Sequence, residues 1–179
     1  DLLDAKLAVM PKTQFLLHRS IRLFFNNGGG PCWIVSVGGY GGANTPTEKK
    51  ATDFTGDVLT ALSNEHEPTM LVAPDAVLLP IDGWQDVMNQ YLLHCVEMQD
   101  RVVIIDVYDG SKARTLSDDD VISGKETGLR NRITGDELSY GVVYYPWLNT
   151  SIVTPDEITF LHLTEAARTK LSKDIAATM

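Results

Sequence analysis

Cysteine is scarce in this sequence, which contains only Cys32 and Cys95. Two cysteines allow at most one disulfide, so the chain does not belong with the small secreted proteins that depend on a disulfide framework. We therefore expect both residues to be buried thiols in a reducing compartment.

Long apolar runs and an excess of positive charge are also missing. No run approaches the roughly 18 apolar residues of a membrane-spanning helix, so we expect no stable membrane insertion. The 15 Lys and Arg residues are outnumbered by 24 Asp and Glu residues, which gives a formal charge of −9. Nucleic-acid partners usually require clustered Lys and Arg, so we expect none. The sequence starts without methionine or a signal-peptide pattern, and we expect it to be part of a longer chain.

What the sequence does have is enough apolar residues for one core. Its 179 residues, 44% of them apolar, suit a single domain that covers 1–179. Segments with helical periodicity alternate with short β-branched runs. This alternation predicts an α/β fold with a mainly parallel or mixed sheet flanked by helices.

The expected elements follow from the spacing of their apolar residues. The helices are predicted at Gln14–Asn27, Asp53–Glu65, Asp82–Gln99, Val121–Ile133 and Thr164–Met179. The strands are predicted at Cys32–Val37, Thr69–Ala73, Arg101–Val107 and Tyr140–Trp147. The third strand is almost continuously apolar, so we expect helices on both faces of the sheet. Residues 109–137 are a polar insert, and Gly28 is expected to end the first helix in a left-handed conformation.

The glycine clusters raise the possibility of a nucleotide site. Gly39-Tyr40-Gly41 begins like the dinucleotide fingerprint, but Asn44 occupies the place of the third glycine or alanine. The phosphate-loop pattern is absent as well. Gly28–Gly30 follow a helix, where the exposed carbonyls disfavour an anion. We therefore interpret these glycines as caps and loop turns and expect no cofactor.

The sharpest enzymatic hypothesis concerns Asp75 and Asp106. Each follows an expected strand, at the sheet edge where α/β proteins bind ligands. Two carboxylates there could hold Mg²⁺ in a hydrolase or a nucleotide-binding enzyme. Aspartates after strands also cap loops and helices, and Asp106-Val-Tyr-Asp109 lacks D-x-D spacing. We favour the structural role and expect no catalytic, cofactor-binding or metal-binding residue.

Three other groups are expected to be structural. His94 and Cys95 are adjacent on a helix and point about 100° apart, so they do not form a nucleophile–base pair. Asp118–Asp120 are expected to face water at a helix start. The aromatic residues of the last strand are expected to pack in the core or an interface: Tyr140, Tyr144, Tyr145 and Trp147.

Four segments, in this order, resemble the tail sheath proteins of contractile phages and of related extracellular contractile injection systems. They are LHRSIRLFFNNGGGPCWIVSVG, FTGDVLTALSNEHEPTMLVAPDAV, LLHCVEMQDRVVIIDV and SYGVVYYPWL, and they span residues 17–148. In the first two segments, a helix ends in Asn-Gly-Gly before a strand that carries an aromatic residue, and a later strand ends in Pro-Asp. In the last two, a helix with a Cys near its end precedes a strand that ends in Asp, and the final strand contains Tyr-Tyr-Pro-Trp.

The resemblance implies a structural subunit without enzymatic activity. Copies would polymerise around an inner tube protein, contact baseplate and terminator proteins, and contract to drive the tube through a target envelope. The resemblance places such a protein in the bacterial cytoplasm during assembly and then in a phage tail or a released injection particle. The N-terminal arm and C-terminal segment that join neighbouring sheath subunits are not recognisable here, and residues after about 150 match nothing in the family.

Overall fold

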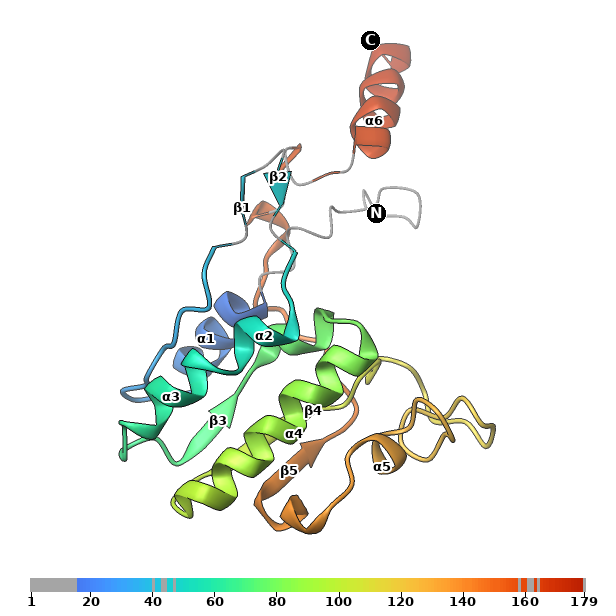
Figure 1. The fold of residues 1–179 in the computed structure, drawn as a ribbon. Helices are drawn as coiled ribbons and strands as arrows, with labels where there is room; N and C mark the ends of the chain where they lie inside the picture. Colours follow the sequence, from blue (N-terminus) through green and yellow to red (C-terminus); the bar gives the residue numbers. More distant parts are fainter. Residues whose placement is uncertain are drawn as a thin grey trace.

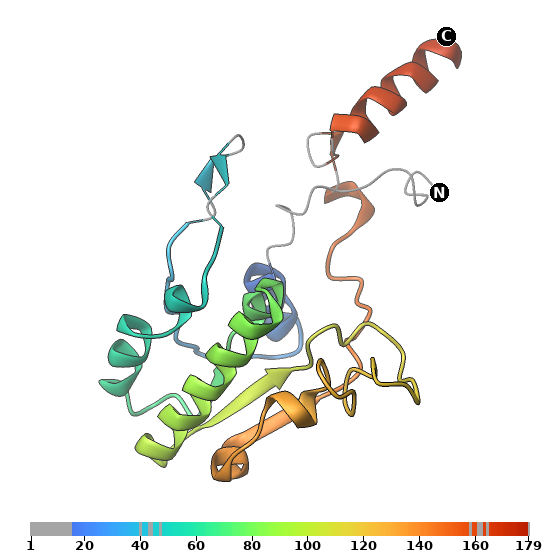
Figure 2. The same cartoon turned by 45° about the vertical axis from the view of Figure 1, so that its right-hand side comes forward.

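The computed structural model describes residues 16–39, 41–42, 45–46, 48–157, 159–160, 163 and 165–178. One body contains the sheet and most of the helices. Two segments project from it in both views (Figures 1 and 2): the short strand pair of β1 (Gly41–Gly42) and β2 (Thr45–Pro46), and helix α6 (Glu165–Thr178).

The body is organised around a three-stranded parallel sheet. Its strands are β3 (Met70–Val72), β4 (Val102–Asp106) and β5 (Gly141–Tyr144), in the order β3-β4-β5. Val72 pairs with Ile104, and Ile104 pairs with Val142. The prediction of an α/β fold with a mainly parallel sheet is confirmed.

Helix α4 (Ile81–Met98) covers one face of this sheet. Its apolar residues recur every three and four positions, which gives the helix a continuous face toward the core. The buried residues of α4 are Trp84, Val87, Met88, Tyr91, Leu92, His94 and Cys95. All of them except His94 pack in one cluster with Leu71, Val103 and Ile105 of the sheet. The helix predicted at Asp82–Gln99 is confirmed.

The opposite face of the sheet is open. Met70 and Tyr144 are 60% and 63% exposed, and Val72 and Val142 are exposed as well. The prediction of helices on both faces is therefore wrong. Helix α1 (Leu16–Asn26) buries none of its residues and contacts η2 (Pro74–Leu78), the 3-10 helix after β3.

The end of α1 has the predicted glycine cap. Gly28 has a φ of +84°, and its amide donates to the carbonyl of Phe25. The amide of Gly29 donates to the carbonyl of Phe24 at 2.9 Å, which completes a Schellman motif. Gln14, where we expected the helix to begin, lies outside the described residues.

Three predicted elements differ in the structure. Cys32–Val37 forms no strand, and its Val35 and Val37 pack on the core from an irregular segment. The helix expected over 53–65 is split into α2 (Ala51–Phe54) and α3 (Asp57–Ser63) because Gly56, between them, has a φ of +56°. The helix expected over 121–133 is limited to α5 (Leu129–Arg132).

The remaining elements surround the last strand and the C-terminal part. The 3-10 helix η3 (Asp136–Tyr140) contacts α4 and leads into β5, and η4 (Pro155–Glu157) precedes α6. The last predicted helix is confirmed as α6, although Thr164 and Met179 lie outside the described residues. No helix in the described ranges is long and apolar enough to cross a membrane.

Candidate functional site

Asp75 is engaged in holding helix α1. It lies in the first turn of η2, directly after β3, and its Oδ1 accepts a hydrogen bond from the backbone amide of Leu16 at 3.0 Å. Leu16 is the first residue of α1, whose initial amides have no partner within the helix. The carboxylate also suits the positive end of the helix dipole. The structure therefore gives Asp75 a structural role as a link between the sheet edge and α1.

Asp106 is the last residue of β4 and pairs in register with Tyr144. Its side chain reaches solvent, yet burial by the surrounding protein raises the pKa of its carboxyl. Its carbonyl oxygen accepts a hydrogen bond from Trp84 Nε1 at 3.2 Å. Among the described residues, no group of three or more His, Cys, Asp or Glu side chains is placed to hold a metal ion.

We expect Mg²⁺ with ATP to leave the melting temperature of the chain unchanged, because Asp75 is already committed to α1. A ligand present at 100 times its Kd would stabilise the folded state by about 2.7 kcal/mol. Differential scanning fluorimetry provides the measurement, with Asp106→Asn as the test variant and Asp119→Asn as the control. A stabilisation that disappears only in Asp106→Asn would support the enzymatic alternative instead.

The described glycines of the first cluster, Gly28–Gly30, do not form a phosphate cradle. Gly28–Gly30 lie at the carboxyl end of α1, where the unpaired groups are carbonyls. A shallow hollow beside them is lined by α1 side chains and these glycines, without a Lys or Arg: Ser20, Leu23, Phe24, Asn27, Gly28, Gly29 and Gly30. Tyr40 of the second glycine cluster lies outside the described residues.

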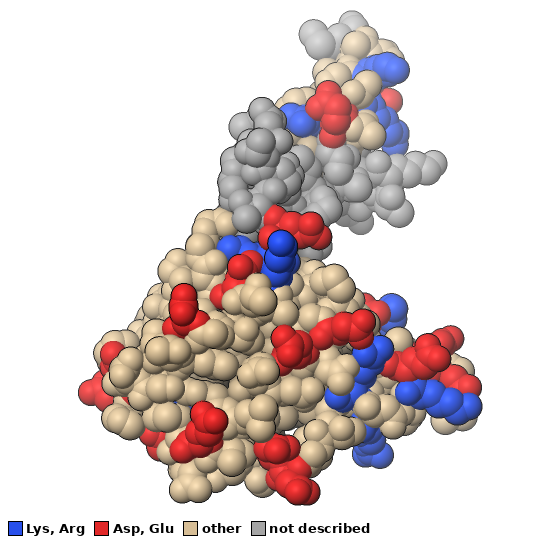
Figure 3. Space-filling view, viewed as in Figure 1, with Lys and Arg blue, Asp and Glu red and all other residues tan. Residues whose placement is uncertain are grey.

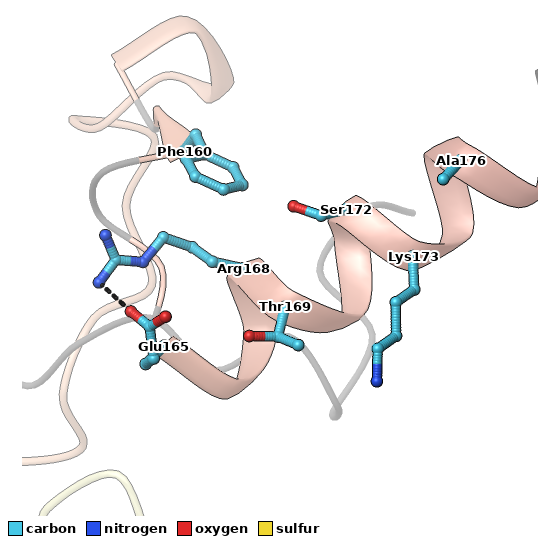
Figure 4. Close-up of a pocket in the computed structure, with 7 residues that line it drawn as sticks. All are labelled: Phe160, Glu165, Arg168, Thr169, Ser172, Lys173 and Ala176. Atoms are coloured by element: carbon cyan, nitrogen blue, oxygen red, sulfur yellow. Dashed lines mark ion pairs between the residues drawn. The ribbon is translucent and has the colours of Figure 1, made fainter.

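A second hollow lies along α6 (Figure 4). Arg168 and Glu165 form an ion pair at 2.9 Å on one side, and Lys173 points away from them. The hollow is wide open and is lined by Phe160, Glu165, Arg168, Thr169, Ser172, Lys173 and Ala176. The described side chains around it form no enclosed floor that could select a ligand.

His94 and Cys95 are both buried, but they do not act as a pair. Burial raises the pKa of the Cys95 thiol to about 11, so Cys95 is a protonated, unreactive core residue. The prediction that Cys95 is buried is confirmed. The same prediction for Cys32 is wrong, since Cys32 is exposed in the irregular segment after α1.

Arg101 forms a buried network that sequence reasoning missed. It lies just before β4, and its side chain is completely shielded from solvent. Nη1 donates to the carbonyl of Leu62 at 2.9 Å, Nη2 donates to the carbonyl of Glu65, and Nε donates to Asp100 Oδ1 at 2.6 Å. These bonds tie the end of α3 to the start of β4. The sequence signal that could have indicated this network is a basic residue at the start of an apolar strand.

His94 contacts the same network. Its Nε2 lies 3.5 Å from Arg101 Nη1, an arrangement in which a neutral imidazole nitrogen can accept a hydrogen bond. Burial lowers the pKa of His94, and the charge of Arg101 lowers it further, whereas Glu97 and Asp100 act in the opposite direction. The folded state therefore favours the neutral imidazole.

We expect stability to decrease as the pH falls below about 6.5, the pKa of histidine in an unfolded chain. Because the folded-state pKa is lower, the unfolded state takes up the proton first, and acid favours unfolding. Urea midpoints at pH 8 and pH 5 measure the effect. In His94→Gln the pH dependence should be smaller, while His66→Gln should retain it, since His66 is largely exposed. Equal slopes in all three proteins would contradict this role for His94.

Asp120 organises the polar insert. Its side chain is completely buried. The carboxylate accepts hydrogen bonds from Arg114 Nε at 2.8 Å and from the Ser123 hydroxyl. It also accepts hydrogen bonds from the backbone amides of Thr115 and Ser123. These donors, Arg114 and the Ser123 hydroxyl first, hold the pKa of Asp120 far below its usual range. The prediction that 118–120 face water is therefore wrong at Asp120, while Asp118 is exposed and pairs with Lys125.

We expect Asp120→Asn to lower the melting temperature by several degrees, because an amide cannot accept all these hydrogen bonds and leaves Arg114 without its counter-charge. Asp118→Asn is the matched control and should change little, since its ion pair is exposed. Thermal unfolding followed by circular dichroism compares the two variants. Equal melting temperatures for both would show that the buried carboxylate adds no stability.

The aromatic segment after β5 packs against the loop after β4. Trp147 Nε1 donates to the carbonyl of Val107 at 2.9 Å, and the Tyr145 hydroxyl donates to the carbonyl of Lys112 at 2.7 Å. A Cβ on Gly110 would lie 2.5 Å from Trp147 Nε1, so this approach requires glycine. These contacts give Tyr145 and Trp147 a packing role, whereas Tyr144 extends the open sheet face.

Comparison of the chain with known protein families and with curated proteins finds no match. Asp75, His94, Cys95, Arg101 and Asp120 are each engaged in the structure of the body. Features that face outward include the open sheet face and helix α6, beside other exposed apolar residues such as Trp33 and Ile34.

Proposed function

We propose that this chain is the body of a contractile tail sheath subunit, a structural protein that polymerises around an inner tube. The observation that carries the proposal is the order of four sheath-like segments between residues 17 and 148. In a subunit of this kind the function depends on contacts between copies, and no catalytic centre is required.

The arrangement of these four segments favours the proposal. Segment 17–38 contains all of α1 except Leu16, and segment 54–77 contains α3 and β3. Segment 92–107 contains the end of α4 and all of β4, and segment 139–148 contains β5. They adjoin one another in a single body with a parallel sheet. Segments that resemble one family would be expected to fold together in this way.

Sheath contraction requires bodies that move as rigid units while the contacts between them change. The cluster beneath α4, with Trp84 and Val103 fully buried, favours such rigidity. The partners of the complete protein would be further copies of itself, the tube protein, and baseplate and terminator proteins. Its place would be the bacterial cytoplasm during assembly, and afterwards a phage tail or a released injection particle.

Electron microscopy of the complete protein tests the proposal. We expect the purified protein to form hollow tubes with a regular helical repeat. These tubes should be wide and short, or should surround a tube protein that is expressed together with it. The 179-residue chain on its own serves as the comparison. Discrete particles without tubes, both with and without the tube protein, would contradict the proposal.

A further inference from the structure

We propose that helix α6 of one copy docks on the open face of the sheet in a second copy. The open face consists of Met70, Val72, Ile104, Val142 and Tyr144. This inference rests on the proposed function, because it supplies one specific contact between subunits of the assembly.

The open face needs a cover. Val72, Ile104 and Val142 form a row across the three strands, and Met70 and Tyr144 extend it at opposite ends. Three of these side chains are more than half exposed: Met70, Val72 and Tyr144. Parallel sheets usually have helices on both faces, and monomeric proteins rarely expose contiguous apolar patches above a few hundred Å². The cover that suits this face is therefore a helix.

Helix α6 has an apolar stripe that is covered only at its start. Ala167, Leu171 and Ile175 recur every four residues and therefore lie on one side of the helix. Ala167 is buried and Leu171 is half-buried, but Ile175 is 52% exposed. Isolated helices shorter than about 12–15 residues are marginally stable in water, and α6, with 14 residues, is near that limit. The outer half of α6 therefore also exposes apolar surface that another protein surface could bury.

The attachment of α6 directs it away from its own sheet. Arg22 of α1 forms a two-pronged ion pair with Glu157, with Nη2 to Oε1 at 3.0 Å, and Glu157 also accepts a hydrogen bond from the Thr154 amide. Eight residues later α6 begins, and it extends outward in both views (Figures 1 and 2). The stripe on α6 and the open face of the same copy thus do not meet, so the two surfaces complement each other between copies.

Charge and size agree with this pairing. Helix α6 carries three cations and two carboxylates in a chain with a formal charge of −9, and Asp106 borders the open face beside Tyr144. Figure 3 shows both signs of charge on the C-terminal helix and on the face of the body that carries α4. A helix of 14 residues is about 21 Å long, and the five residues of β4 span about 17 Å.

A contact between two different surfaces is head-to-tail, so it can repeat from copy to copy. Interfaces that bury less than roughly 1,200 Å² are usually transient, and a single helix on a small sheet buries less than this area. We therefore expect the 179-residue chain to associate reversibly at micromolar concentrations and to form a series of species that grows with concentration.

Sedimentation velocity over a concentration series tests the contact. Ile175→Asp places a charge on the helix stripe, and Tyr144→Asp places one on the open face. Each is expected to weaken self-association at least tenfold, which corresponds to about 1.4 kcal/mol. Leu116→Asp is the matched control, since Leu116 is fully exposed in the polar insert, and it should associate like the parent. Met70→Asp provides a second face variant, and melting curves establish that each variant is folded.

Mixing the two variants gives the decisive result. The Tyr144→Asp chain keeps an intact helix, and the Ile175→Asp chain keeps an intact open face. Each alone should be monomeric, whereas their mixture should form one-to-one pairs that do not grow further. A parent chain that remains monomeric, variants that associate like the parent, or a mixture that remains monomeric would overturn the inference.

The complete protein separates this inference from the proposed function. If Ile175→Asp still forms tubes like the parent, the helix contact is wrong and the sheath function stands. If the parent forms no tubes while the mixed variants form one-to-one pairs, the contact is correct and the proposed function is wrong.

Discussion

Replacing Trp84 with alanine is expected to lower the free energy of unfolding by about 3–5 kcal/mol, the usual cost of truncating a buried tryptophan. Trp84 has no solvent exposure and lies between α4 and the sheet. Its ring lies 5.7 Å from the ring of Tyr108, and its Nε1 donates to the carbonyl of Asp106. The substitution removes both contacts and leaves a cavity in the centre of the body.

Chemical denaturation measures this effect, with Leu93→Ala as the matched control. Leu93 lies on the same helix but is 44% exposed, so its truncation should cost less than about 1 kcal/mol. If both variants unfold at the same urea concentration, the assignment of the buried face of α4 is wrong.

The second large effect is expected from Arg101→Met. Methionine can fill much of the space of the arginine stem, but it cannot donate to the carbonyls of Leu62 and Glu65 or to Asp100. Because the carbonyl of Leu62 would then be buried without this donor, we expect a loss of about 3 kcal/mol in the free energy of unfolding. The connection between the end of α3 and β4 should loosen at the same time.

Lys125→Met is the control for Arg101→Met. Lys125 pairs with Asp118 on the surface, where both side chains are exposed, so the loss should stay below about 1 kcal/mol. Urea denaturation measures the stability, and hydrogen exchange of the amides in α3 reports the local loosening. Unchanged exchange in α3 together with parent-like stability would contradict the proposed importance of the Arg101 network.

The elements with strong internal patterns were predictable from sequence. Helix α4 has 18 residues with a continuous apolar face, and β4 is a run of apolar residues, so neither depends on a distant partner for its pattern. The cap at Gly28 was predictable for the same reason, because a glycine cluster followed by proline ends a helix locally.

Elements that depend on a partner were not predictable. Cys32–Val37 has the composition of a strand, but a strand forms only where a neighbour pairs with its backbone, and this segment is irregular. Its Val37 carbonyl accepts a hydrogen bond from Lys49 instead. The apolar run of β4 similarly predicted two covered faces, although α4 supplies a cover for only one.

The candidate site residues could likewise be predicted only where their role does not depend on a distant partner. Sequence correctly placed Asp75 and Asp106 beside strands β3 and β4, but only the structure reveals that Asp75 is bound to the first amide of α1. Asp120 looked like part of a solvated acidic run, and its burial depends on Arg114 and Ser123 folding around it. Burial of a charge is determined by tertiary contacts that a local pattern does not contain.

The proposed function requires the body to act as a rigid building block of a contracting assembly. Cryo-electron microscopy of the complete protein, reconstructed before and after triggered shortening, measures whether it does. We predict that the body containing β3, β4, β5 and α4 superimposes in the two states while the contacts between copies change. A helical assembly whose body unfolds or repacks on shortening, or a protein that forms no helical assembly at all, would contradict the proposed function.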